Sequence, residues 1–89
     1  MKKLRVGVVG CGYIANNRHI PSFLKQSSIE LSAICDVDRK RLQNTATTFN
    51  IKKNYENFSQ MLKTENLDIV DICVPPKLHA QLAIEVAES

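Results

Sequence analysis

The chain has 89 residues, of which 44% are hydrophobic and 24% are charged, an ordinary composition for one globular domain. Twelve basic and nine acidic residues give a net charge of +3, and the basic residues form short, separate clusters without interleaved aromatic residues. This pattern disfavours a nucleic-acid partner. No stretch is long and apolar enough to cross a membrane, so we expect no membrane partner either.

The cysteines indicate the redox compartment. Cys11, Cys35 and Cys73 are odd in number and lack C-x-x-C spacing. We therefore expect reduced thiols in a cytoplasmic protein. Each lies near the end of an apolar run, where a small buried hydrophobe is the simpler interpretation, and we expect no metal site.

The first elements follow from one apolar run and one glycine pattern. Residues 4–10 form a short segment that is apolar apart from Arg5, which predicts a buried strand. A helix is expected over residues 12–18. Pro21 removes a backbone donor and disfavours helical geometry at Ile20, so we expect a break there and a second helical turn that ends near residue 26.

The remaining elements alternate between strand and helix. Residues 30–35 read as a strand, with Leu31, Ala33 and Cys35 on one side and Ile34 on the other. Asp38 is a good N-cap for a helix over residues 39–49. A short strand over 53–55, a helix over 57–63, a strand over 68–74 and a helix that begins at residue 76 or 77 complete the chain.

The turn after the first strand has the form Gly10-x-Gly12-x-x-Ala15. Gly10 permits a tight turn, Gly12 lets a pyrophosphate approach the main chain, and Ala15 lets the helix pack against the strand. The first amides of the helix would then point at the phosphates. The pattern favours a dinucleotide-binding loop, and a plain glycine-rich turn is the alternative.

Four strands alternating with helices predict an α/β fold with a doubly wound parallel sheet of the Rossmann type. The expected strand order is 3-2-1-4, in three layers with helices on both faces. A ligand should bind at the carboxyl ends of the first and fourth strands, where the order reverses.

Asp36 ends the second strand, where a carboxylate can accept hydrogen bonds from an adenosine ribose. A carboxylate there repels a 2′-phosphate, which favours NAD, although the nearby Arg39, Lys40 and Arg41 leave NADP possible. The alternative is that Asp36 only caps a turn.

Other polar residues lie near the same edge or inside the sheet. Pro75 and Pro76 end the fourth strand, and His79 follows in the first helical turn, where it is either a ligand contact or a surface histidine. His19 is expected to be structural, satisfying groups freed by Pro21. Asp71 lies inside an apolar strand and needs a partner on one face.

Taken together, these motifs resemble the amino-terminal part of the glucose–fructose oxidoreductase/inositol 2-dehydrogenase (Gfo/Idh/MocA) family. The matching pieces are the glycine loop, Arg18-His19 with Pro21, Ala33 to Asp36, and the segment from Asp68 to His79, which is similar to the family's D-x-V-x-I-x-T-P-x-x-x-H. The resemblance covers nearly the whole chain.

The resemblance implies a set of cofactor-binding residues: Gly10, Gly12, Tyr13, Ile14, Asp36, Val74, Pro75, Pro76 and His79. It implies an NAD(P)-dependent oxidoreductase that transfers hydride between the nicotinamide and a sugar, cyclitol or related alcohol. Val74 replaces the family's usual threonine and Pro76 its common asparagine, so the contacts of those polar groups are lost.

By the same resemblance, residues 1–89 are the first part of the NAD(P)-binding domain. The family's catalytic lysine and its carboxyl-terminal substrate domain would lie beyond Ser89, so we expect no catalytic residue here and no activity of this part alone. We expect the parent protein to be homo-oligomeric. Two alternatives remain open: a non-catalytic NAD-sensing module, and a methyltransferase, although Val8-Val9 stand where the latter usually has an acidic residue.

Overall fold

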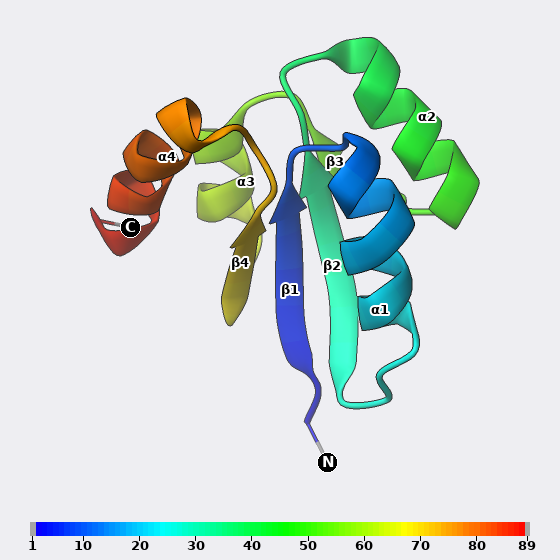
Figure 1. Cartoon of the computed structure of the whole chain (residues 1–89). Coiled ribbons are helices and arrows are strands. Elements are labelled where there is room, and N and C mark those ends of the chain that lie inside the picture. Colours follow the sequence, from blue (N-terminus) through cyan, green and yellow to red (C-terminus); the bar gives the residue numbers. More distant parts are fainter. Residues whose placement is uncertain (1, 89) are drawn as a thin grey trace.

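The computed structural model describes residues 2–88 and all of their side chains except those of Pro76 and Lys77. The elements in chain order are β1 (Leu4–Val9), η1 (Ala15–His19), α1 (Ile20–Leu24), β2 (Ile29–Cys35), α2 (Arg39–Phe49), β3 (Asn54–Tyr55), α3 (Phe58–Thr64), β4 (Ile69–Ile72) and α4 (Pro76–Glu88). Figure 1 shows them as a central sheet with helices on both of its faces. None of the described helices is long and apolar enough to span a bilayer.

The sheet has the order β3-β2-β1-β4, and every pair of neighbouring strands is parallel. The predicted Rossmann-type fold and strand order are therefore confirmed. Parallel pairing requires a crossover between consecutive strands, which places η1, α1 and α2 on one face and α3 and α4 on the other (Figure 1).

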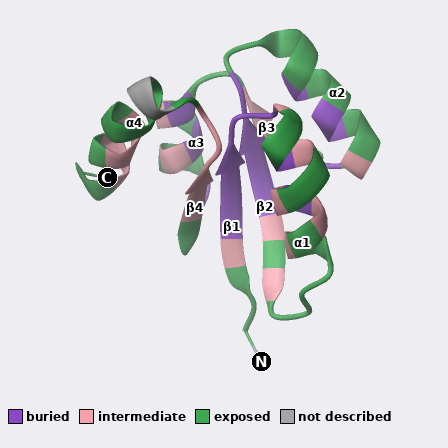
Figure 2. Cartoon of the chain, in the orientation of Figure 1, coloured by how far each residue is buried: buried purple, intermediate pink, exposed green. Residues whose placement is uncertain are grey.

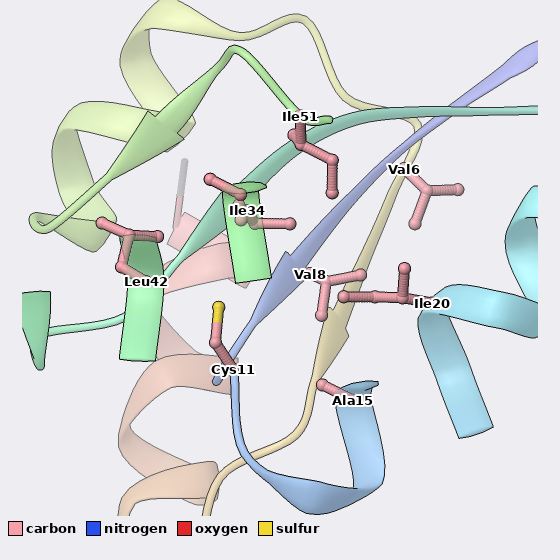
Figure 3. Packing of buried hydrophobic residues seen from close by; sticks show 9 residues of the cluster. Val6, Val8, Cys11, Ala15, Ile20, Ile34, Leu42 and Ile51 are labelled. Atoms are coloured by element: carbon pink, nitrogen blue, oxygen red, sulfur yellow. The ribbon is translucent and has the colours of Figure 1, made fainter. Parts of the chain in front are cut away.

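Two apolar clusters fix the helices on the sheet. The first joins Val6, Val8 and Ile34 of the sheet to Ile20 of α1 and Leu42 of α2 (Figure 3). The second lies on the other face, where Val9, Ala33 and Cys35 pack against Phe58 and Met61 of α3, with Leu82 and Val86 of α4 at its margin. Burial is deepest in the carboxyl halves of β1 and β2 (Figure 2).

The pairing of β1 with β2 contains a bulge. Val6 lies opposite Leu31, but the next residue, Gly7, lies opposite Ala33. The extra residue reverses the alternation of side chains, so Leu31 packs with the first cluster and Ala33 with the second. The prediction that Leu31 shares a face with Ala33 and Cys35 is therefore wrong, because it assumed an uninterrupted period of two.

The helix after the glycine loop does not break at Pro21. It runs through a π-helical segment, η1, in which the amide of Ile20 bonds to the carbonyl of Ala15, and continues directly into α1. A wider turn accommodates a residue that has no amide to donate, so the proline is absorbed within the helix. The predicted interruption is wrong for this reason.

The other predicted elements lie close to the observed ones. Helix α2 has the predicted bounds, and Asp38 caps it by accepting a hydrogen bond from the amide of Arg41. Helix α3 begins one residue later than expected because Asn57 is its N-cap. Strand β4 is shorter than predicted at both ends.

Candidate dinucleotide-binding site

The loop between β1 and the first helix forms one wall of the candidate site. Gly10 has φ +96°, and a Cβ at this position would lie 2.4 Å from the carbonyl oxygen of Cys73. Only glycine fits, both for the backbone angle and for the close approach of β4. At Gly12 a Cβ would meet no described atom within 4 Å. The chain's own packing therefore does not require glycine there, and the space beside it is open to a ligand.

The side chain of Asp36 fixes this loop by a hydrogen bond to its backbone. Its side chain is buried, and Oδ2 accepts a hydrogen bond from the amide of Cys11 at 2.8 Å. Its Oδ1 accepts one from the amide of Asp38, also at 2.8 Å. The guanidinium Nε of Arg41 lies 3.3 Å from Oδ2 and compensates the charge. Asp36 is thus both a turn cap and the anchor of the glycine loop.

Asn16 anchors the loop from the other side, and sequence reasoning missed it. Its side-chain amide donates to the carbonyls of Cys11 (2.8 Å) and Gly12 (2.7 Å). Its own oxygen accepts a hydrogen bond from the buried Thr45 of α2 at 2.8 Å. The available signal was an amide residue one helical turn after the second glycine, together with a threonine on the buried face of α2.

The helix that follows presents its amino-terminal end to the loop. Its first backbone hydrogen bond runs from the amide of Asn16 to the carbonyl of Gly12, at 3.1 Å. The preceding amides, those of Tyr13, Ile14 and Ala15, therefore come before the first intrahelical bond. The side chains of Tyr13 and Ile14 are exposed, and neither of these predicted site residues is among those that line the pocket described next.

A pocket of about 290 Å³ lies over the carboxyl ends of β1, β2 and β4. Its walls are largely apolar, with one buried acid and one arginine among them. The lining residues are Val9, Gly10, Cys11, Gly12, Cys35, Asp36, Val37, Arg41, Phe58, Cys73, Val74, Pro75, Leu78, Gln81 and Leu82. The fold therefore brings together five of the residues predicted for the site: Gly10, Gly12, Asp36, Val74 and Pro75.

The other predicted site residues lie differently. His79 is exposed on the first turn of α4, while the pocket is lined by its neighbours Leu78, Gln81 and Leu82. The side chain of Pro76 lies outside the described part of the chain. A larger open depression of about 610 Å³ lies between α2, β3 and α3, away from the glycine loop. It is shallow and polar, and we do not regard it as the cofactor site.

Burial suppresses the acidity of the thiols at this edge. It raises the pKa of Cys11 to about 11, with the Asp36 carboxylate adding to the effect, and the pKa of Cys35 to about 12. Both groups are therefore neutral thiols at physiological pH, and neither is a nucleophile.

A glycine turn, a helix amino terminus and a buried acid after the second strand define a dinucleotide-binding Rossmann domain. Residues 4–89 match the profile described as "Oxidoreductase family, NAD-binding Rossmann fold", and the chain belongs to this Gfo/Idh/MocA family. The resemblance read from the motifs is confirmed.

Several curated and solved relatives are similar over nearly the whole chain. D-apiose dehydrogenase of Paraburkholderia graminis is 32% identical over 98% of this chain and 23% of its own length. The WlbA dehydrogenase of Bordetella pertussis, solved with NADH and UDP-GlcNAcA, is 35% identical, with a TM-score of 0.90 over 98% of this chain and 27% of that one. An oxidoreductase of Agrobacterium radiobacter, solved with NAD+, L-tartaric acid and magnesium, is 29% identical, with a TM-score of 0.88 over 97% and 25%. The chain thus spans about a quarter of the length of these relatives.

Proposed function

We propose that this chain is the dinucleotide-binding part of an NAD-dependent oxidoreductase acting on a sugar, cyclitol or related alcohol. The observation that carries the proposal is the convergence of Gly10, Gly12 and Asp36 on one pocket at the switch point of the sheet. The names of the relatives support the substrate class, since several are sugar dehydrogenases.

Each part of the site has a role in this proposal. The amides that follow Gly12 would bind the pyrophosphate, and the remaining lone pairs of Asp36 would accept from the adenosine ribose. The apolar walls exclude water from the bound dinucleotide. When bound, NAD supplies a hydride acceptor. The family resemblance further suggests cofactor contacts around Val74, Pro75 and Pro76, with His79 near the nicotinamide side.

We also propose that residues 1–89 bind NAD mainly through the adenosine half and do not turn over an alcohol by themselves. Among the described residues that line the pocket, none is suited to take the alcohol proton, because the thiols of Cys11, Cys35 and Cys73 are neutral and Asp36 already accepts two hydrogen bonds from the backbone. A cytoplasmic location and homo-oligomeric assembly of the parent protein remain proposals. The three free cysteines support the first.

Gly12→Ala tests the phosphate contact directly. The new methyl group enters open space, so the thermal unfolding midpoint should stay close to that of the wild type. The methyl group would stand where a pyrophosphate approaches, and NAD affinity measured by calorimetry should fall at least about 10-fold, or about 1.4 kcal/mol. ADP-ribose should show the same loss. Unchanged NAD affinity in the folded variant would contradict the proposed site.

A sensing module without chemistry is the second candidate. It predicts the same NAD binding and the same effect of Gly12→Ala, so binding alone does not separate the two. Reduction of NAD by the parent protein with a panel of sugars and cyclitols, followed at the nicotinamide absorbance, favours the oxidoreductase. Binding without turnover across that panel would favour the sensor.

A further inference from the structure

A second group of chemically reactive side chains lies outside the glycine loop. His19, at the end of η1, meets Asp71 of β4 and Cys73 just after it, and their ligand atoms all lie within 4.8 Å of one another. The Nδ1 atom of His19 is 2.5 Å from Oδ2 of Asp71 and 3.3 Å from Sγ of Cys73. The thiol is 3.4 Å from the same carboxylate oxygen. Three different donors therefore converge on one point.

This arrangement is not that of a cysteine nucleophile. In such sites the thiol and the acid bond to opposite ring nitrogens, so that the imidazole can take a proton on one side while the acid orients the other. Here both groups approach Nδ1. Burial and the neighbouring Asp71 also raise the pKa of Cys73 to about 12, which keeps it a thiol in the absence of a cation. Nucleophilic catalysis is therefore disfavoured.

We propose that His19, Asp71 and Cys73 form a binding site for a divalent transition metal of the zinc class, with a fourth position open to water or another ligand. A nitrogen, an oxygen and a sulfur ligand match the preference of Zn²⁺, whereas Mg²⁺ and Ca²⁺ prefer oxygen alone. As the metal–sulfur bond forms, the thiol proton passes to solvent. The ring proton by which Nδ1 of His19 bonds to Asp71 leaves this nitrogen and the ring is protonated on Nε2 instead, so that Nδ1 is free to bind the metal.

The distances agree with this proposal on two of three edges. Metal–sulfur and metal–nitrogen bonds of about 2.3 and 2.0 Å in a tetrahedron place sulfur about 3.5 Å from each of the other ligands. The observed 3.3 and 3.4 Å are close to that value. The nitrogen–oxygen edge is a hydrogen bond at 2.5 Å and would widen to about 3.3 Å. His19 and Asp71 have the freedom to do so, since their side chains are 40% and 21% exposed.

The site would join two elements that are distant in sequence. It fastens the end of η1 to the carboxyl end of β4, across 54 residues, and Cys73 is also part of the wall of the dinucleotide pocket. The sequence analysis expected no metal site because the three cysteines lack the spacing of a metal-binding motif. It did not combine one of them with a histidine from the other side of the fold.

Cobalt titration of the metal-free, reduced protein tests the proposal without any cofactor. Co²⁺ bound by a thiolate in a tetrahedral site gives a sulfur-to-metal charge-transfer band in the near ultraviolet and intense visible bands, and Zn²⁺ should displace both. We expect one equivalent of Co²⁺ to produce them. Failure of the wild type to develop a charge-transfer band would overturn the proposal, whatever the result of the NAD experiments.

Variants identify the ligands. Cys73→Ala should abolish the charge-transfer band, and His19→Gln or Asp71→Asn should lower the affinity for Co²⁺ at least about 100-fold, more than the usual loss of an outer hydrogen-bond partner. Cys35→Ala and His79→Gln are matched controls that leave the band unchanged. A band that persists in Cys73→Ala but disappears in Cys35→Ala would contradict this ligand set. Far-ultraviolet circular dichroism establishes that each variant is folded.

Discussion

The carboxylate of Asp36 accepts a hydrogen bond from the amide of Cys11, the residue between the two loop glycines, at 2.8 Å. The residue proposed to recognise the ribose is therefore also the residue that holds the phosphate loop in shape. Loop geometry and cofactor recognition are coupled through one buried side chain, and a substitution at Asp36 should affect both.

Asp36→Ser should change cofactor choice. Loss of the carboxylate removes both its hydrogen bond to a ribose hydroxyl and its repulsion of a 2′-phosphate, and Arg41 is released from its partner 3.3 Å away. The difference in binding free energy between the two cofactors should shift toward NADP by about 1–3 kcal/mol, the size of a charge-assisted hydrogen bond. Calorimetry with both dinucleotides measures it. Asp38→Ser, which keeps an N-cap at the neighbouring turn, is the control, and an unchanged ratio in Asp36→Ser would show that this carboxylate does not face the ribose.

Gly10→Ala should destabilise the fold itself. The methyl group would meet the carbonyl oxygen of Cys73 at 2.4 Å, on a backbone with φ +96° that alanine rarely adopts. We expect the free energy of unfolding to fall by about 2–4 kcal/mol from strain and displacement of β4. Urea denaturation compares it with Gly12→Ala, whose methyl group has open space. Equal stability of the two variants would contradict the steric argument.

Arg5→Met should cost more than an exposed ion-pair deletion. Arg5 lies 3.2 Å from the buried Glu65, which also accepts a hydrogen bond from Tyr55. Loss of Arg5 leaves a buried carboxylate with less compensation, and we expect a loss of about 2–3 kcal/mol. The control is Arg39→Met, because Arg39 and Glu56 form a pair of similar distance at the exposed surface, where the change should stay within about 0.5 kcal/mol. Similar losses of unfolding free energy in the two variants would show that Arg5 does not stabilise the buried carboxylate of Glu65.

The raised pKa values of the three thiols lead us to expect that the free energy of unfolding falls at alkaline pH. Burial raises the pKa of Cys11, Cys35 and Cys73 in the folded chain from 9.0 to about 11, 12 and 12. Above pH 9 the unfolded chain releases these protons and the folded chain keeps them, so stability present below pH 9 is lost as the pH rises toward 11–12. Each group contributes a slope of about 1.4 kcal/mol per pH unit within its window.

Urea denaturation between pH 8 and 10.5 measures this slope. Cys35→Ala should remove the contribution of one thiol from the slope of unfolding free energy against pH. Lys52→Gln, at an exposed position, should leave that contribution unchanged. A slope that does not change in Cys35→Ala would mean that this thiol ionises equally in both states.

Local pattern was sufficient to predict most of the fold. The apolar runs, the glycine turn and the cap at Asp38 each depend on neighbouring residues, and the strand order follows from the connections. The bulge at Leu31 and the π-helical accommodation of Pro21 depend instead on how one element fits against another. No local periodicity carries that information.

The candidate site was located from the sequence only in part, and its contacts with a dinucleotide stay a prediction. Gly10, Gly12 and Asp36 carry a motif whose spacing has a physical reason, and the fold brings them to one pocket. Asn16 and Thr45, which fix the loop, bond across 29 residues. His19 was expected to compensate for Pro21, but its ring bonds to Asp71 on β4. The partner expected for Asp71 is therefore present, from an element that sequence could not place beside it.

The position of β1 between β2 and β4 also has a consequence for the order of folding. Its pairing with β2 joins Leu4 to Ile29, whereas its pairing with β4 joins Val6 to Ile69, a loop about two and a half times longer. The longer closure costs about 0.8 kcal/mol more in chain entropy. The first strand–helix–strand unit can therefore assemble early, with the bulge and the Asp36 anchor already in place. We therefore expect β4 to pair with β1 after β2 does, so that the carbonyl of Cys73 approaches Gly10 only once Asp36 already holds the glycine loop.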